Sequence, residues 1–181
     1  MTRRIAVRGD LLDFTAAPAW GDTSPASLRW RPDHWLLIEA DGRIAGAQPG
    51  DVEPGAQWER HDHSGRLVLP GFIDTHVHSA QIDVIASFGS QLLDWLETYT
   101  FPAELRNADP AHAEAGAALF LDALLAHGTT SAVVFPTVHK GAADALFAAA
   151  QARGMRLVAG KVLMDRNAPP DLCDDVVQAE R

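Results

Sequence analysis

From residue 67 onward the chain alternates between extended and helical patterns, and this alternation restricts the fold more than any other feature. Residues 67–73 form an almost unbroken apolar run, which is typical of a strand covered on both faces. Residues 129–135 are β-branched and apolar, and residues 155–164 form a third extended segment. Residues 92–96 predict a short helix, and longer helical patterns separate the strands. We therefore predict an α/β fold with successive βαβ units, a parallel sheet and right-handed crossovers that place the helices on one side.

The two longer helices have recognisable ends. Asp109 precedes Pro110, which places a capping side chain before a proline at the first helical position, and Gly128 closes this helix. Residues 142–153 predict the second helix, which ends at Gly154. The side chains expected on the buried faces are Ala113, Ala117, Phe120, Leu121 and Leu124 in the first helix and Leu146, Phe147 and Ala150 in the second.

Residues 1–66 show a different pattern, in which short apolar stretches are separated by turn residues. Strands are predicted at residues 5–7, 35–39 and 43–47. Asp41-Gly42 lies between the last two and is a strong hairpin signal, because both turn positions tolerate a positive φ. The sequence therefore predicts two domains, a β-rich segment over residues 1–66 and an α/β segment after it.

Composition narrows the possible partners. The 181 residues include 15 Lys and Arg against 24 Asp and Glu, a formal net charge of −9, which argues against nucleic acid or an anionic membrane as the main partner. The single cysteine, Cys173, excludes a disulfide framework and a cysteine-based zinc finger. No apolar run reaches the roughly 18 residues of a membrane span, and no signal-peptide core follows the basic start. We therefore expect a soluble cytoplasmic protein.

His76 and His78 follow the first apolar run and are separated by one residue. Side chains alternate along a strand, so the two imidazoles point the same way and can converge on one ion. Neutral imidazole is a good ligand for zinc and also for iron, and ligands bind at the carboxyl ends of parallel strands. The pattern fits a metal site, and it fits equally a strand-end pair that only hydrogen-bonds loops. Asp74 is either a carboxylate that supports the site or an acid bonded to backbone.

Two other positions show how weak histidine spacing is by itself. His61 and His63 have the same spacing, but they lie in the polar stretch over residues 58–64 with no buried strand leading into it. We interpret them as solvated. His139 follows the second predicted strand, and we interpret it as a loop histidine.

Longer motifs extend the pattern around the histidine pair. They are PGFIDTHVH at residues 70–78, then Gln81, LLDWL at 92–96, YTFPAE at 99–104, GTTSA at 128–132 and GKVLMDRN at 160–167. With these motifs, residues 67–170 resemble the metal-dependent amidohydrolases, and within them the guanine deaminases.

The resemblance implies a (β/α)8 barrel of the TIM type with a zinc ion, or an iron ion, at its catalytic centre. The metal polarises a water molecule, which attacks guanine and releases ammonia and xanthine. His76 and His78 match the first two metal ligands. The substrate-binding stretch runs over His78, Ser79, Ala80 and Gln81, whose amide suits a purine edge. Trp95 and Phe101 would shape an apolar wall, unless they only pack.

The resemblance also implies an incomplete barrel. Residues 67–181 hold three predicted strands, whereas a complete barrel has eight and takes about 250 residues. We expect the first three βα units, preceded by a partial β-sandwich over residues 1–66, and no activity of this chain alone. The remaining metal ligands and the acid that moves protons match nothing in the chain.

A complete enzyme of this kind is expected to be a homodimer that acts on a small molecule. Two alternatives remain open at this point. One is an amidohydrolase acting on another aminated heterocycle, and the other is a non-catalytic partial barrel.

Overall fold

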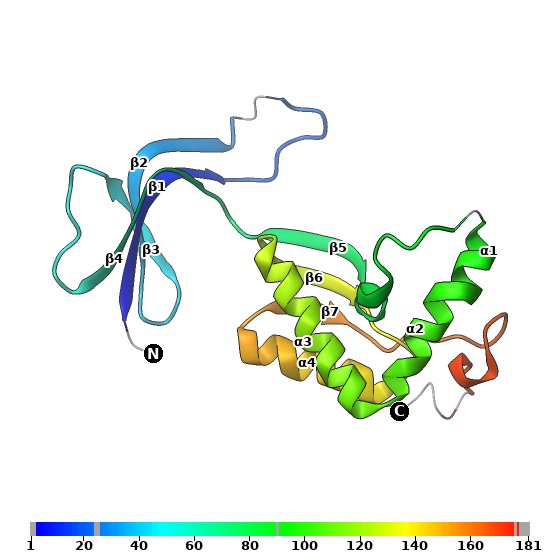
Figure 1. Cartoon of the computed structure of the whole chain (residues 1–181). Helices are drawn as coiled ribbons and strands as arrows, with labels where there is room; N and C mark the ends of the chain where they lie inside the picture. Colours follow the sequence, from blue (N-terminus) through cyan, green and yellow to red (C-terminus); the bar gives the residue numbers. More distant parts are fainter. Residues whose placement is uncertain (1–2, 24–25, 90, 176, 178–181) are drawn as a thin grey trace. The chain divides into compact units, whose positions relative to one another are not determined.

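The computed structural model describes residues 3–23, 26–89, 91–175 and 177. The chain divides into two compact units, Met1–Pro70 and Gly71–Arg181, each of which has its own sheet (Figure 1).

The first unit is a four-stranded sheet with the order β3-β2-β1-β4. β2 pairs antiparallel with both β1 and β3, whereas β4 pairs parallel with β1. The strands are β1 (Arg4–Phe14), β2 (Leu28–Ile38), β3 (Ile44–Pro49) and β4 (Trp58–Val68).

The predicted hairpin between β2 and β3 is confirmed. Gly42 has a φ of 84°, and the Glu39 amide donates to the Arg43 carbonyl over 2.8 Å. Three core side chains of this unit are almost fully buried, namely Ala6, Leu11 and Trp35.

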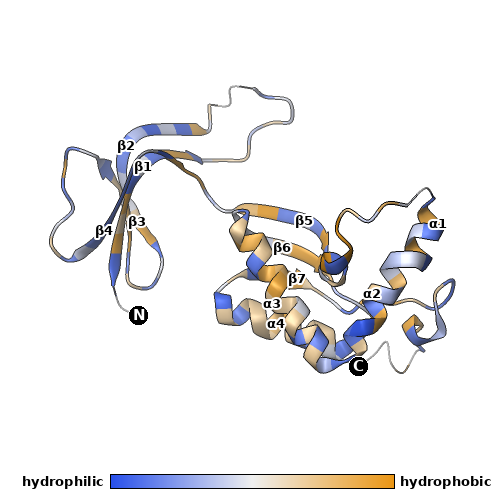
Figure 2. Cartoon of the chain, viewed as in Figure 1, coloured by the Kyte–Doolittle hydropathy of each residue, from blue (hydrophilic) through white to orange (hydrophobic). Residues whose placement is uncertain are grey.

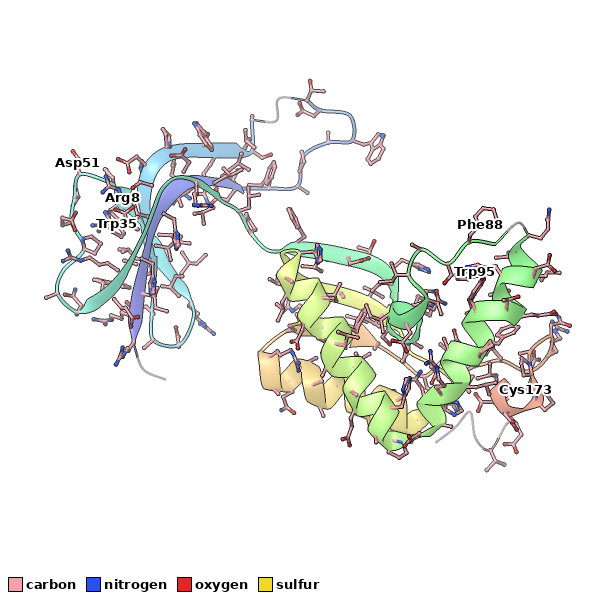
Figure 3. All side chains as sticks on the ribbon, viewed as in Figure 1. Arg8, Trp35, Asp51, Phe88, Trp95 and Cys173 are labelled. Atoms are coloured by element: carbon pink, nitrogen blue, oxygen red, sulfur yellow. The ribbon has the colours of Figure 1, made fainter. Side chains whose placement is uncertain are left out.

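Trp35 is the large buried aromatic residue of the first sheet, and both its ring and its indole N–H make polar contacts. The Arg8 guanidinium lies 5.6 Å from the centroid of the Trp35 ring (Figure 3). The Trp35 Nε1 donates a hydrogen bond to the Gly50 carbonyl over 3.2 Å. Arg8 also pairs with Asp33 over 2.7 Å. The sheet therefore relies on cross-strand polar contacts around one large aromatic side chain.

The second unit is an α/β fold, as predicted. Its strands are parallel in the order β5-β6-β7, namely β5 (Phe72–His78), β6 (Thr129–Phe135) and β7 (Arg156–Ala159). The connecting helices are α3 (Pro110–Ala126) and α4 (Lys140–Arg153). Both helices contact each other and the sheet, so they cover the same face.

Short helical segments occupy the long connection after β5 and the region after β7. They are η1 (Ser79–Val84), α1 (Leu92–Trp95), the π-helical η2 (Leu96–Thr100), α2 (Phe101–Leu105), η3 (Arg106–Ala108) and η4 (Pro170–Leu172). Within the described ranges, no helix is long and apolar enough to cross a membrane.

The predicted start of α3 and end of α4 are confirmed, whereas α4 begins at Lys140, two residues before the predicted start at Ala142. Asp109 Oδ1 accepts from the Ala111 amide over 3.0 Å at the start of α3, and Gly154 ends α4 with a φ of 66°. The predicted inner faces are confirmed except that Leu124 is only partly buried and Phe147 is 43% exposed. The core lies between these helices and the sheet and is formed by Ala117, Phe120, Leu121, Ala132, Val134, Leu146 and Ala150.

The prediction of one buried strand over residues 67–73 is wrong. β4 ends at Val68 and β5 begins at Phe72, while Phe72 and Ile73 are 57% and 69% exposed. The break falls at Pro70-Gly71. Proline has no amide hydrogen to continue a ladder, and a Cβ on Gly71 would clash with Thr130.

Two further extended segments differ from the prediction. The strand predicted over residues 155–164 shrinks to Arg156–Ala159, the four residues that pair with β6. The polar stretch containing His61 and His63 lies inside β4, which is hydrophilic along most of its length (Figure 2). Both histidines are nonetheless exposed, as expected of solvated side chains.

Candidate functional site

His76 and His78 occupy the carboxyl end of β5 and point the same way. Their ring centroids lie 5.3 Å apart, in an edge-on arrangement with an interplanar angle of 62°. The predicted convergence of the two imidazoles is therefore observed, because both residues have the same parity on one strand.

Phe135 joins the two rings from the neighbouring strand. It ends β6, pairs in register with His78, and lies 5.0 Å from the His76 ring and 5.2 Å from the His78 ring. The stack on His78 is close to parallel, with an angle of 19°. Sequence reasoning missed this residue. It ends the predicted strand over residues 129–135, but only the register between β5 and β6 places it beside His78.

The environment of His78 favours its neutral form. Burial lowers the pKa of its imidazole, and the neighbouring His76 lowers it further. Its Nδ1 is buried and has no hydrogen-bond partner in the described structure. A neutral ring with an unpartnered nitrogen is suited to coordinating a metal ion.

Asp74 supports this end of β5 through the backbone. Its Oδ1 accepts a hydrogen bond from the His76 amide over 3.0 Å. Of the two interpretations offered by the sequence, the structure shows the acid bonded to backbone. Because the donor is the amide of His76, the bond also restrains the backbone position from which the His76 imidazole projects.

A pocket of about 370 Å³ opens beside the histidines. Trp95 of α1 borders it (Figure 3), and its Nε1 donates to the Ser87 carbonyl over 3.1 Å, which links the helix to the loop after η1. The lining residues are His76, Val77, His78, Gln81, Ile82, Val84, Ile85, Ala86, Ser87, Trp95 and Phe120. The pocket therefore combines polar groups from β5 and η1 with an apolar wall.

The other residues singled out by the sequence divide into two groups. Gln81 lines the pocket, whereas Ser79 is half-buried and Ala80 is buried, both outside its lining. Phe101 borders a different hollow. His139 lies in a loop, as expected, directly before α4, and its Nε2 is buried without a partner.

Glu104 is the polar residue of this region that the sequence analysis did not single out. It is 7% exposed, and burial raises the pKa of its carboxyl, while the neighbouring Gln81 side chain opposes that rise. It was visible only as the last letter of the YTFPAE motif. No periodicity or spacing signal connects it with Gln81.

The histidine pair fits one part of a metal site. Its two imidazoles converge, and one of their nitrogens is buried without a partner. Among the described residues, no group of three or more His, Cys, Asp or Glu side chains could hold an ion. The donors present thus suit two positions of a coordination sphere that takes three or four protein ligands.

Comparison with known proteins matches this part of the chain to one family. A family model described as "Amidohydrolase family" matches residues 67–181. The guanine deaminase of Escherichia coli K12 is 41% identical over 180 residues, covering 93% of this chain and 39% of that protein. A probable guanine deaminase of Deinococcus radiodurans is 51% identical over 114 residues, covering 63% of this chain and 26% of that protein.

Solved structures give the same result. The E. coli guanine deaminase structure superposes with a TM-score of 0.88 at 39% identity, covering 97% of this chain and 42% of that one. The Clostridium acetobutylicum guanine deaminase, described with guanine bound in the active site, gives 0.78 at 26% identity, covering 98% and 40%. This chain spans about 40% of the length of these two structures. Because the family model matches residues 67–181, the chain belongs to the amidohydrolase family.

Proposed function

We propose that this chain provides the first metal ligands and part of the purine pocket of a guanine deaminase, which hydrolyses guanine to xanthine and ammonia. The observation that carries the proposal is that His76, His78 and Gln81 line one pocket. The similar proteins are named as guanine deaminases, and one of their structures is described with guanine in its active site.

We also propose the architecture of the complete enzyme. The β5-β6-β7 sheet with α3 and α4 would be the first three βα units of a (β/α)8 barrel, assigned to residues 67–181. Residues 1–66 would form part of a flanking β-sandwich. The parallel order and the histidines at the carboxyl end of the first strand support this assignment.

His76 and His78 would hold the metal ion, for which zinc is our first choice and iron the second. When bound, such an ion supplies Lewis-acid activation of water near neutral pH. The chain's own contribution is to keep the His78 ring neutral by burial and to restrain the His76 backbone through Asp74. Phe135 limits the rotation of both rings by packing against them.

The substrate contacts proposed for this chain come from residues 78–81 and the apolar wall. The Gln81 amide offers both a donor and an acceptor, which matches the alternating groups on a purine edge. Trp95 and Phe120 would exclude water from the ring faces. The ligand is therefore a small planar heterocycle. We also propose that the complete enzyme is a homodimer, as the family resemblance implies, and that it acts in the cytoplasm.

The test is a chimaera in which residues 1–181 of this chain replace the matching part of the E. coli relative. We expect it to release ammonia from guanine and to lose that activity on His76→Ala, because one metal ligand is gone. His61→Ala is the matched control and should leave the rate unchanged. Turnover of adenine or cytosine with guanine left untouched would contradict the proposal.

A further inference from the structure

One guanidinium donor of the first unit is buried without a partner. Arg31 lies on β2, and its Nε has no hydrogen-bond partner among the described residues. Its Nη2 donates to Asp13 Oδ2 over 2.8 Å, so the position of the guanidinium is fixed by that bond. An arginine side chain only donates hydrogen bonds, and a buried donor left unsatisfied is costly. The buried Nε therefore calls for an acceptor that the described residues do not supply.

The carboxylate beside Arg31 is shared with a second arginine. Arg29 Nε and Nη2 donate to the two oxygens of Asp13 over 2.7 and 2.9 Å, which is the bidentate geometry of a strong pair. Arg31 donates to an oxygen that Arg29 already uses. The three side chains lie on one face of the sheet, because Arg29 and Arg31 alternate on β2 and Arg29 pairs in register with Asp13. Two guanidinium groups against one carboxylate leave a surplus of one positive charge on this face.

A small hollow of about 120 Å³ adjoins this charge. Among the described residues that line it, Arg31 and Asp13 alone are charged, and the remaining lining is apolar, including Leu36, Ile44 and Val68. Sites for larger ligands take roughly 300–1,000 Å³, so this hollow suits only a few non-hydrogen atoms. Its occupant must therefore be small and must combine an acceptor with a short apolar portion.

We propose that this hollow binds a short aliphatic monocarboxylate, with its carboxylate on Arg31 Nε and its alkyl chain against Leu36, Ile44 and Val68. One negative charge matches the surplus positive charge, and a carboxylate accepts a charge-assisted hydrogen bond from a guanidinium nitrogen. The apolar lining selects an alkyl chain over a hydroxylated one, because a hydroxyl would lose its hydrogen bonds to water there. The site lies in the first unit and does not depend on the proposed function.

The rim of the hollow favours a free acid over an acidic side chain of another polypeptide. Ile44 and Leu69 line the hollow while remaining 67% and 40% exposed, so they form its rim. The backbone that carries a glutamate side chain would lie on these apolar groups, which offer no partner for its N–H and C=O groups. A free acid brings no such groups with it.

The first experiment titrates the 181-residue chain with sodium butyrate at constant ionic strength and follows the Arg31 Nε–H signal and the methyl signals of Leu36 and Val68 by NMR. We expect saturable shifts with a dissociation constant of about 1 mM, within the range open to a ligand of about six non-hydrogen atoms. Arg31→Met removes the donor and should weaken binding, read from the methyl signals, at least about tenfold. Arg43→Met is the matched control at a side chain that is 88% exposed, and it should leave the constant unchanged.

The second experiment compares ligands on the natural chain, so its result does not depend on the folding of a variant. Butanol lacks the charge and γ-hydroxybutyrate has a polar chain end, and each should bind at least about tenfold more weakly than butyrate. A glutamate blocked at both ends should also bind more weakly, and its tighter binding would overturn the assignment of a free acid. Shifts that grow linearly with butyrate, or equal affinity in Arg31→Met, would overturn the site itself.

Discussion

The molecule contains two histidine pairs with identical spacing, and only one of them has the surroundings of a site. His61 and His63 lie in the middle of β4, where His61 Nε2 is 3.4 Å from Glu59 and both rings face solvent. His76 and His78 end β5, pack against Phe135 and border a pocket. Alternation along a strand places both pairs on one side, so spacing alone does not distinguish them.

What distinguishes the pairs is the chain that follows each strand. β5 leads directly into η1, and the helical segments after it provide the wall of the pocket, including Trp95. β4 continues past its histidines for five more residues, and the described residues between it and β5 form no helix. Position at a strand end, followed by a covering connection, is therefore the informative part of the motif.

The largest expected effect concerns the cores behind the two pairs. Leu121 is fully buried between α3 and the β5-β6-β7 sheet, whereas Leu11 borders a hollow of about 120 Å³ in the first unit. We expect Leu121→Ala to lower the free energy of unfolding by about 4 kcal/mol and Leu11→Ala by about 2 kcal/mol. Urea unfolding followed by circular dichroism measures both. An equal or larger loss at Leu11 would show that the site does not lie on the better-packed scaffold.

The second prediction compares the pairs directly as ligands. His78→Ala should weaken zinc binding by the 181-residue chain at least about tenfold, because one of two converging imidazoles is removed. His63→Ala removes the equivalent ring from β4 and should leave the affinity unchanged. Competition with a chromophoric chelator gives both constants. Equal losses in the two variants would remove the distinction between the pairs.

The third prediction uses the acid associated with each pair. Asp74 Oδ1 accepts from the amide of His76 over 3.0 Å, and Asp62 Oδ1 accepts from the amide of Ser64 over 2.9 Å. Asp74→Ala should cost about 1 kcal/mol of stability and also weaken zinc binding several-fold. Asp62→Ala should leave zinc binding as it was. If Asp74→Ala changed stability alone, the acid would have no part in presenting His76.

The smallest effect is electrostatic and belongs to the first unit. Arg29 lowers the pKa of the Asp13 carboxyl through a 2.7 Å bond, so the carboxylate stabilises the folded sheet at pH values above its ordinary pKa. That contribution is lost as the pH falls through the lowered folded-state value. Asp13→Asn should remove less than about 1 kcal/mol at neutral pH and nothing in strong acid. Thermal melts at several pH values test this, and a loss that grew in acid would contradict the sign.

Sequence patterns predicted α3, α4 and β6 because their periodicity and at least one end of each helix carry local signals. Asp109 caps α3, Gly154 ends α4, and both act within one turn of chain. The pattern failed for β4 and β7, whose extents depend on partners far away in sequence. β4 is a strand because β1 lies beside it, and β7 ends where its pairing with β6 ends.

The residues of the candidate site also fall into those that the sequence predicted and those that only the structure revealed. Alternation placed the histidines together, and the motif after them led to Gln81. Phe135 required the register of two parallel strands, and Glu104 required the packing of α2 against η1. Neither contact has a periodicity that a single sequence could reveal.

By itself, the sequence determined the α/β class of the second unit, its parallel βαβ succession and the common direction of two imidazoles. These follow from period, capping and strand parity, which act over a few residues. Only the tertiary structure decided which histidine pair has a pocket and which acid of α2 is buried near it. Those outcomes depend on burial, and burial arises only when distant segments pack together.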